Sequence, residues 1–217
     1  MKTESMKHLQ QMYQMCSEDM SYFKELIEAI IRIESETKTK SKFKIWDYVL
    51  IDAIRPSMAC VFHDNGYKVA SDSHILIAIK EDYPEDLEGR LMRKDGTLMD
   101  EGTRFPKWRD VIPNPELSEM VPVKIDFTKV REFEADFKAK KKASDRKSFD
   151  AYIRVRENCA FRLDYLVKMV KAMEHIGTDT LMVNADGWRA ALAVGGESKA
   201  ILMPIRCVDD KELVYTL

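Results

Sequence analysis

The sequence has few of the features that place a protein in a membrane or in an oxidising compartment. No apolar run in its 217 residues approaches the ~18 residues that cross a bilayer, and its start lacks the apolar stretch of a signal peptide. The four cysteines stand far apart and form no C-x-x-C pair, which is typical of reduced thiols rather than of a disulfide framework. We therefore expect a cytoplasmic protein without a membrane partner.

Signatures of catalysis are also missing. The histidines are scattered, and none has the H-x-x-x-H or H-E-x-x-H spacing of a metal site. Asp72 and His74 lie two residues apart, but no G-x-S-x-G nucleophile motif accompanies them. Gly195 and Gly196 lack the spacing and the following lysine of a phosphate-binding loop. These absences predict that the protein is not an enzyme and has no catalytic residues, metal or cofactor.

Glycine and proline are both absent from the first 55 residues. Within that stretch apolar residues recur at spacings of three and four between Leu9 and Ile31, which predicts amphipathic helices. The polar run at residues 34–42 then predicts a linker. We therefore expect an N-terminal helical extension over residues 1–41, followed by a distinct region 42–217. Methionines in the apolar stripe favour core packing, with a groove for a partner as the alternative.

Two later stretches look like copies of one strand–helix–strands unit. Residues 43–49 match residues 161–167, and each predicts a short strand followed by a helix that begins at an aspartate. Residues 64–70 match residues 185–191 on either side of a turn glycine. Alternation and turn signals predict further strands at residues 57–63, 67–71, 74–79, 180–184, 188–194 and 199–203.

These repeats predict the fold class. A third, partial copy begins at Pro122 and continues as a helix through Phe137 and a strand at residues 151–155. Repeated units of this kind predict an α+β fold, with helices on one face and sheets on the other. Asp95 and Gly96 predict a hairpin between the first two copies. We expect units at about residues 42–80, 121–158 and 159–207, with the hairpin and a linker in residues 81–120.

Three short motifs follow one another along this region. Residues 69–76 read VASDSHIL, residues 104–114 read RFPKWRDVIPN, and residues 200–207 read AILMPIRC. In the same order they resemble the V-A-T-D-G-H-R-L, R-F-P-D-Y-R-R-V-L-P and Y-V-V-M-P-M-R-L segments of the bacterial DNA sliding clamp family, the beta subunit of DNA polymerase III. Residues 161–206 are similar to the last strand–helix–three-strand unit of a clamp. The resemblance implies a DNA-clamp-like fold over about residues 43–207.

The resemblance also implies a site for partner proteins. Clamp partners insert a short linear peptide into an apolar pocket where these motifs meet, and leucine, methionine, isoleucine and proline suit its floor. Ser73 replaces a glycine where the backbone can need positive φ, and Ile75 replaces an arginine. The alternative is that the motif residues only close a domain junction. Carried over by motif, the peptide-binding residues are Ser73, His74, Leu76, Pro113, Met203, Pro204, Ile205, Arg206 and Cys207.

The net charge of −2 argues at first against a nucleic-acid partner, but the charge is unevenly distributed. Residues 124–171 hold 14 Lys and Arg against 8 Asp and Glu, a local net charge of +6, so the rest of the chain carries −8. Clamps line a ring with helices whose basic side chains contact the phosphates of double-stranded DNA without reading bases. A solvated helix face is the alternative. The candidate DNA contacts are Lys138, Lys140, Lys141, Lys142, Arg146, Lys147, Lys168 and Lys171.

Three interpretations of the function remain open. A full clamp subunit has six of these units, whereas this sequence has about three. The first interpretation is a non-catalytic sliding-clamp-like processivity factor that forms a homo-oligomer, binds DNA, and docks peptides of polymerase or repair proteins. The second is an interaction or regulatory protein that binds partner peptides and does not encircle DNA. An enzyme that reuses the fold is the third.

Overall fold

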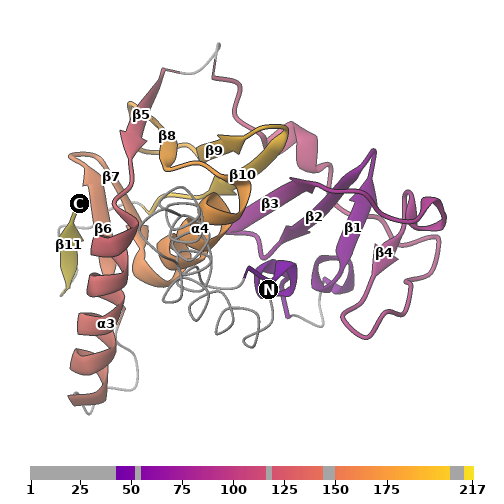
Figure 1. Ribbon diagram of the computed structural model, residues 1–217, viewed down its shortest axis with the longest axis horizontal. Helices are drawn as coiled ribbons and strands as arrows, with labels where there is room; N and C mark the ends of the chain where they lie inside the picture. Colours follow the sequence, from indigo (N-terminus) through magenta and orange to yellow (C-terminus); the bar gives the residue numbers. More distant parts are fainter. Residues whose placement is uncertain (1–42, 52–54, 116–118, 144–149, 206–212) are drawn as a thin grey trace, which may run out of the picture. The chain divides into compact units, whose positions relative to one another are not determined.

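An eight-stranded sheet organises most of the chain that the computed structural model describes (Figure 1). The described residues are 43–51, 55–115, 119–143, 150–205 and 213–217. They belong to one compact unit that begins at Phe43 and ends at Leu217. The predicted N-terminal helical extension lies outside the described residues.

The strands of the large sheet come from both ends of this unit. Their order is β4-β1-β2-β3-β10-β9-β8-β5, and every neighbouring pair is antiparallel. In the β1–β2 hairpin Asn65 and Gly66 both have positive φ, as a tight two-residue turn requires. The strands are β1 (Val61–Asp64), β2 (Tyr67–Ser71), β3 (Ile75–Lys80), β4 (Leu91–Met92), β5 (Met120–Lys124), β8 (Thr180–Asn184), β9 (Ala191–Gly195) and β10 (Ser198–Leu202).

The two halves of this sheet join along a seam between β3 and β10. In the register of the seam, Leu76 pairs with Ile201. At one end of it the Ser198 hydroxyl oxygen accepts a hydrogen bond from the Lys80 backbone N–H at 2.9 Å, across 118 positions of sequence. The seam therefore brings the motif at residues 69–76 beside the start of the motif at residues 200–207.

A second sheet has three strands in the order β11-β6-β7. They are β6 (Tyr152–Arg156), β7 (Cys159–Arg162) and β11 (Val214–Thr216). β6 and β7 are antiparallel, whereas β11 runs parallel to β6 along its other edge. β11 is not predicted by the sequence pattern, because three residues are too few to show alternation.

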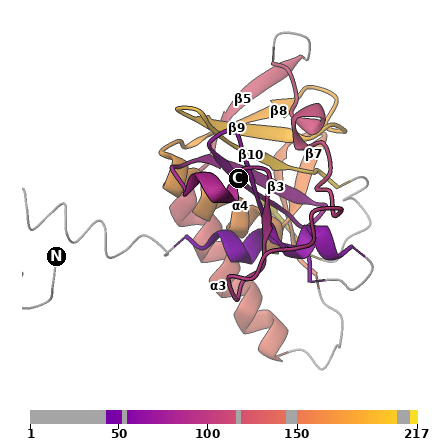
Figure 2. The same cartoon turned by 90° about the vertical axis from the view of Figure 1, so that its right-hand side faces the viewer.

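Two α-helices, α3 (Phe127–Ala143) and α4 (Leu163–Ile176), pack against each other. α4 buries Leu166, Met169 and Met173 in the main core, which it shares with the inner faces of both sheets. It ends at Gly177, whose φ of 78° caps the helix in the left-handed conformation. α3 buries only Val130, and its last turns extend past the other described elements (Figures 1 and 2).

The opposite face of the large sheet is covered by residues 103–115, here called the strap. Trp108 of the strap packs in an apolar cluster with Leu192 and other residues of β2, β3, β9 and β10. Its indole N–H donates a hydrogen bond to Asp64 Oδ2 at 2.7 Å. The Arg109 guanidinium lies over the indole ring and forms an ion pair with the same carboxylate. These contacts fix the strap to the end of β1.

The first predicted unit is the least regular, and here the structure corrects two expectations. The helix expected within residues 43–49 is a single 3-10 turn, Ile45–Tyr48, and none of the described residues before it forms a strand. The N-cap residue of this turn, Lys44, makes no side-chain capping hydrogen bond. The expected helix therefore lacks the stabilisation that a cap gives to a helix start. The strand expected at residues 57–63 begins only at Val61, because Pro56 opens another 3-10 turn.

The other elements predicted within the described residues are confirmed, with shifts of a few residues at their ends. β2 and β8 have the expected bounds, and both later helices are present. The hairpin around Asp95 closes through a bridge between Met92 and Leu98, with Gly96 at positive φ. The fold class is therefore the predicted α+β arrangement of helices packed on antiparallel sheets.

Candidate functional site

An apolar pocket of about 260 Å³ lies where β3, β10 and the strap meet. Leu76 of β3, Ile201 of β10 and Trp108 of the strap line it. Two further lining residues stay exposed, Val111 by 56% and Met203 by 45%. Exposed aliphatic side chains around a preformed apolar hollow are typical of a surface that buries a partner.

Four of the predicted peptide-binding residues line this pocket, namely Ser73, His74, Leu76 and Met203. The backbone holds two of them together, because the Met203 N–H donates to the His74 carbonyl oxygen at 2.9 Å. The seam of the large sheet thus joins two of the three predicted motifs into one cavity wall.

The structure places Pro113 outside this pocket. Pro113 lines a separate hollow of about 450 Å³, together with Trp108 and Val194. The strap contributes Pro106 and Val111 to the first pocket instead. The motif contains both prolines, and its spacing alone does not tell which of them faces the pocket.

The residues after Met203 contribute less than the motif suggested. Pro204 is not among the residues that line the pocket. Ile205 instead pairs with β7, where its N–H donates to the Ala160 carbonyl oxygen at 2.9 Å. Arg206 and Cys207 lie outside the described residues.

Sequence reasoning missed several lining residues. Phe105 and Trp108 belong to the RFPKW part of the strap, so two aromatic residues in a quoted motif were a signal for them. Met58 shows no local signal, because only the tertiary fold brings its sulfur to 3.9 Å from the Ser73 hydroxyl. Arg55 beside it is also missed for this reason.

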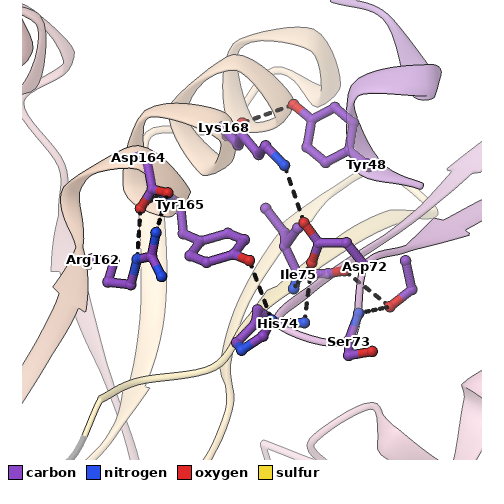
Figure 3. A network of polar contacts seen from close by, with 10 residues as sticks. Tyr48, Asp72, Ser73, His74, Ile75, Arg162, Asp164, Tyr165 and Lys168 are labelled. Atoms are coloured by element: carbon purple, nitrogen blue, oxygen red, sulfur yellow. Dashed lines mark hydrogen bonds and ion pairs between the residues drawn. The ribbon is translucent and has the colours of Figure 1, made fainter. Parts of the chain in front are cut away.

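A tight turn over residues 72–74 brings Ser73 and His74 to the pocket, and Figure 3 shows the polar contacts of this turn. Ser73 adopts the left-handed conformation, with a φ of 79°, as expected from the glycine that it replaces. Asp72 is buried, and its Oδ1 accepts the N–H groups of His74 at 3.1 Å and Ile75 at 3.0 Å. Lys168 of α4 donates to the other oxygen at 3.0 Å. The buried carboxylate is therefore fully partnered, and it makes the turn rigid.

The His74 side chain contacts α4 (Figure 3). Its ring stacks on Tyr165 with centroids 5.0 Å apart, and the Tyr165 hydroxyl lies 3.2 Å from Nδ1. The Arg162 guanidinium lies 5.2 Å from the Tyr165 ring centroid and pairs with Asp164. Burial, more than any neighbouring charge, raises the pKa of Tyr165. The tyrosine hydroxyl therefore stays neutral and holds the ring of His74, which lines the pocket.

Four predicted DNA contacts lie on the exposed end of α3 (Figure 2). They are Lys138, Lys140, Lys141 and Lys142. The first two pair with carboxylates one turn earlier, Glu134 at 2.5 Å and Asp136 at 2.6 Å. Within the described part of the chain, Lys141 and Lys142 have no carboxylate partner. Among the described residues, these two lysines therefore add positive charge to the exposed end of α3 without a neutralising carboxylate.

The other predicted DNA contacts are placed differently. Lys168 forms the ion pair with the buried Asp72, so its charge is partly neutralised within the protein. Lys171 is half-buried on α4. Arg146 and Lys147 lie outside the described residues.

The described residues show neither a metal-binding cluster nor a membrane-spanning helix. Among the described residues no cluster of three or more His, Cys, Asp and Glu side chains could hold a metal ion. No described helix is both long enough and apolar enough to span a bilayer. Cys60 and Cys159 are buried free thiols, and burial raises the pKa of Cys159 to about 11. Cys16 and Cys207 lie outside the described residues.

Solved bacterial sliding clamps share this fold. The DNA polymerase III beta subunit of Pseudomonas aeruginosa matches with a TM-score of 0.54 and 15% identity, over 74% of this chain and 61% of that one. The Caulobacter crescentus beta clamp gives 0.52 and 15%, over 74% and 61%. The beta subunit from Streptococcus pyogenes gives 0.52 and 12%, over 75% and 62%. The chain thus spans about three fifths of the length of these clamps. No family model and no curated protein matches the sequence.

Proposed function

We propose that the protein is a non-catalytic docking protein with the sliding-clamp fold, which binds a short linear peptide in the pocket between β3, β10 and the strap. The observation that carries the proposal is the pocket itself, in which the exposed Val111 and Met203 flank the buried Leu76 and Trp108. Peptides that bind such pockets use leucine or phenylalanine anchors, and burying one such side chain contributes about 2 kcal/mol. The structural likeness to replication clamps makes a replication or repair protein the expected partner.

Peptide titration tests the pocket. A labelled peptide with leucine and phenylalanine anchors is titrated into the full chain, and Val111→Ala and Met203→Ala should each weaken binding about fivefold, because each removes roughly 1 kcal/mol of apolar contact. Val194→Ala is the matched control, since it shortens an exposed valine that lines the other hollow. Equal affinity in all three variants would remove the pocket from the function.

DNA binding without sequence specificity is the second candidate function. It is favoured by the four lysines at the exposed end of α3, of which Lys141 and Lys142 lack a carboxylate partner in the described structure. Reversing both charges to glutamate should weaken binding to double-stranded DNA and flatten its dependence on salt, because fewer counterions are released. Reversal of the exposed Lys44 and Lys94 serves as control. An unchanged salt slope in the α3 variant would reject this surface.

Peptide docking without encircling DNA is the interpretation that the sheet edges favour. Rings built by sheet extension need long free edges. Among the described strands, the edges of the large sheet are β4, which has only two residues, and β5, which contains Pro122. The edges of the second sheet are β11, which has three residues, and β7, which has four and is bridged to Ile205. The mass of the full chain in solution and its retention on closed circular DNA test this point. A multimer that stays on the circle would support the clamp interpretation instead.

A further inference from the structure

β11 covers the edge of β6 and contacts α3 through Tyr215 (Figure 1). The surface that β11 covers, formed by β6 and by Phe133 and Asp136 of α3, is here called the groove. It runs parallel to β6 and pairs with it along Val214–Thr216. The Tyr152 N–H donates to the Leu213 carbonyl oxygen at 3.0 Å, and the Leu217 N–H donates to the Arg154 carbonyl oxygen at 3.1 Å. The last residues of the sequence therefore satisfy backbone groups that an edge strand would leave unpaired.

One side chain of β11 enters a socket on α3. The Tyr215 ring stacks on Phe133 with centroids 4.5 Å apart, and its hydroxyl donates a hydrogen bond to Asp136. Lys140 lies 5.5 Å from the ring centroid and also pairs with Asp136. These two hydrogen bonds, from Lys140 first and then from Tyr215, lower the pKa of Asp136. The socket combines an aromatic wall, an anionic acceptor and a cation, and it selects a phenol over an aliphatic group.

The groove contacts every second side chain along residues 213–217. Leu213, Tyr215 and Leu217 pack against the main core, whereas Thr216 is exposed. This pattern of aliphatic, tyrosine and aliphatic residues at every second position is how a groove recognises an added strand: backbone hydrogen bonds give affinity, and alternate side chains give specificity.

The pairing of β11 is short enough to be reversible. Only three residues of β11 pair with β6, and it lies at the edge of its sheet. Short edge segments open at free energies well below that of global unfolding, so the groove becomes vacant while the rest of the fold persists. We propose that this groove is a second docking site, for an extended partner strand with the aliphatic–x–tyrosine–x–aliphatic pattern, and that β11 closes it in the free chain by competing for it.

Binding of a peptide in trans tests the proposal. The probe is a fluorescently labelled synthetic peptide with the sequence of residues 210–217. Tyr215→Ala in the full chain weakens the internal competitor, so this variant should bind the probe at least about tenfold more tightly than the unmodified chain. Thr216→Ala is the control, because Thr216 is exposed, and it should behave as the unmodified chain. A probe with alanine in place of its tyrosine should bind about tenfold more weakly.

Hydrogen exchange shows whether the groove is open in each variant. The Tyr152 amide, which β11 protects, should exchange faster in Tyr215→Ala than in Thr216→Ala. A chain ending at Glu212 removes the competitor entirely and should bind the probe most tightly. Cooperative thermal unfolding would show that this shortened chain is folded. If it is folded and does not bind the probe, the proposal is overturned. It is equally overturned if Tyr215→Ala, with its Tyr152 amide exposed, binds the probe no better than the unmodified chain.

Discussion

The rings of His74 and Tyr165 are stacked at 5.0 Å although the two residues are 91 positions apart in the sequence. His74 follows the left-handed Ser73 at the start of β3, and Tyr165 lies in the first turn of α4. Through this contact and the ion pair between Asp72 and Lys168, α4 holds the turn that carries two pocket residues.

Asp72 should stabilise the turn that carries the pocket residues Ser73 and His74. Asp72→Ala leaves two backbone N–H groups and the Lys168 ammonium without their acceptor, so we expect a loss of about 3 kcal/mol in the free energy of unfolding. Asp72→Asn keeps an oxygen acceptor for the backbone and should cost less, about 1 kcal/mol. Urea unfolding measures both, with the exposed Asp164→Ala as control. Equal losses for the two Asp72 variants would contradict the role of the backbone bonds.

Ser73→Gly should stabilise the protein. A non-glycine residue at a φ of 79° carries a conformational penalty that glycine avoids, and we expect a gain of about 0.5–1 kcal/mol in the free energy of unfolding. The matched control is Ser198→Gly in β10, which should lower stability because it removes the hydroxyl that accepts the Lys80 N–H. Thermal unfolding compares the two. If both variants lose stability equally, strain at Ser73 is absent.

Trp108 should anchor the strap through its indole nitrogen. Trp108→Phe preserves an aromatic ring in the apolar cluster but removes the hydrogen bond to Asp64, and we expect a cost of about 2 kcal/mol by chemical denaturation. Trp188→Phe, at a tryptophan that is 55% exposed, should change stability by less than about 0.5 kcal/mol. A similar cost at both positions would show that the indole bond does not hold the strap.

His63 should make stability depend on pH in the mildly acidic range. The side chain is fully buried, and this burial lowers its pKa. The ring faces the edge of Tyr83, the Arg90 carbonyl oxygen, Lys68 and Glu88. Because the folded state favours the neutral ring, its contribution is complete above the unfolded pKa of about 6.5 and is lost as the pH falls.

Substitution separates His63 from the carboxylates. His63→Gln cannot take up a proton, so its free energy of unfolding should change less than that of the unmodified chain between about pH 7 and pH 5. Glu88 and Asp136, whose pKa values are lowered, contribute stability that is lost only at lower pH, near their unfolded values of about 4. Identical slopes for the two proteins from pH 7 to pH 5 would exclude His63 as the titrating group.

Local patterns predicted those parts of the fold that local physics determines. The turn at Asn65 and Gly66 and the apolar spacing of α4 were visible in the sequence because turn geometry and helical periodicity depend on neighbouring residues. Residues 45–48 were expected to form a helix because residues 43–49 match residues 161–167, where α4 begins. The structure shows a 3-10 turn there instead. β11 was missed because its stability comes from β6 and from the socket on α3.

The pocket was predictable only in part, for a similar reason. Leu76 and Met203 were found through motifs, but their meeting depends on the seam. The path of the strap decides that Pro106, and not Pro113, lines the pocket. The turn before β1 brings Met58 to the pocket. The ion pair of Lys168 was invisible in the sequence because its partner lies 96 positions away.

The seam between β3 and β10 imposes an order on events during protein synthesis. The ribosome releases Lys80 long before Ser198, 118 positions later, so the newly made β3 has no partner on this edge for most of that time. Its first five residues, Ile75–Ile79, are apolar and buried in the finished protein. An unpaired apolar edge is a template for wrong strand pairing, and pairing across so many residues forms slowly. We therefore expect the nascent chain to be most prone to wrong strand pairing before β10 is made and covers this edge of β3.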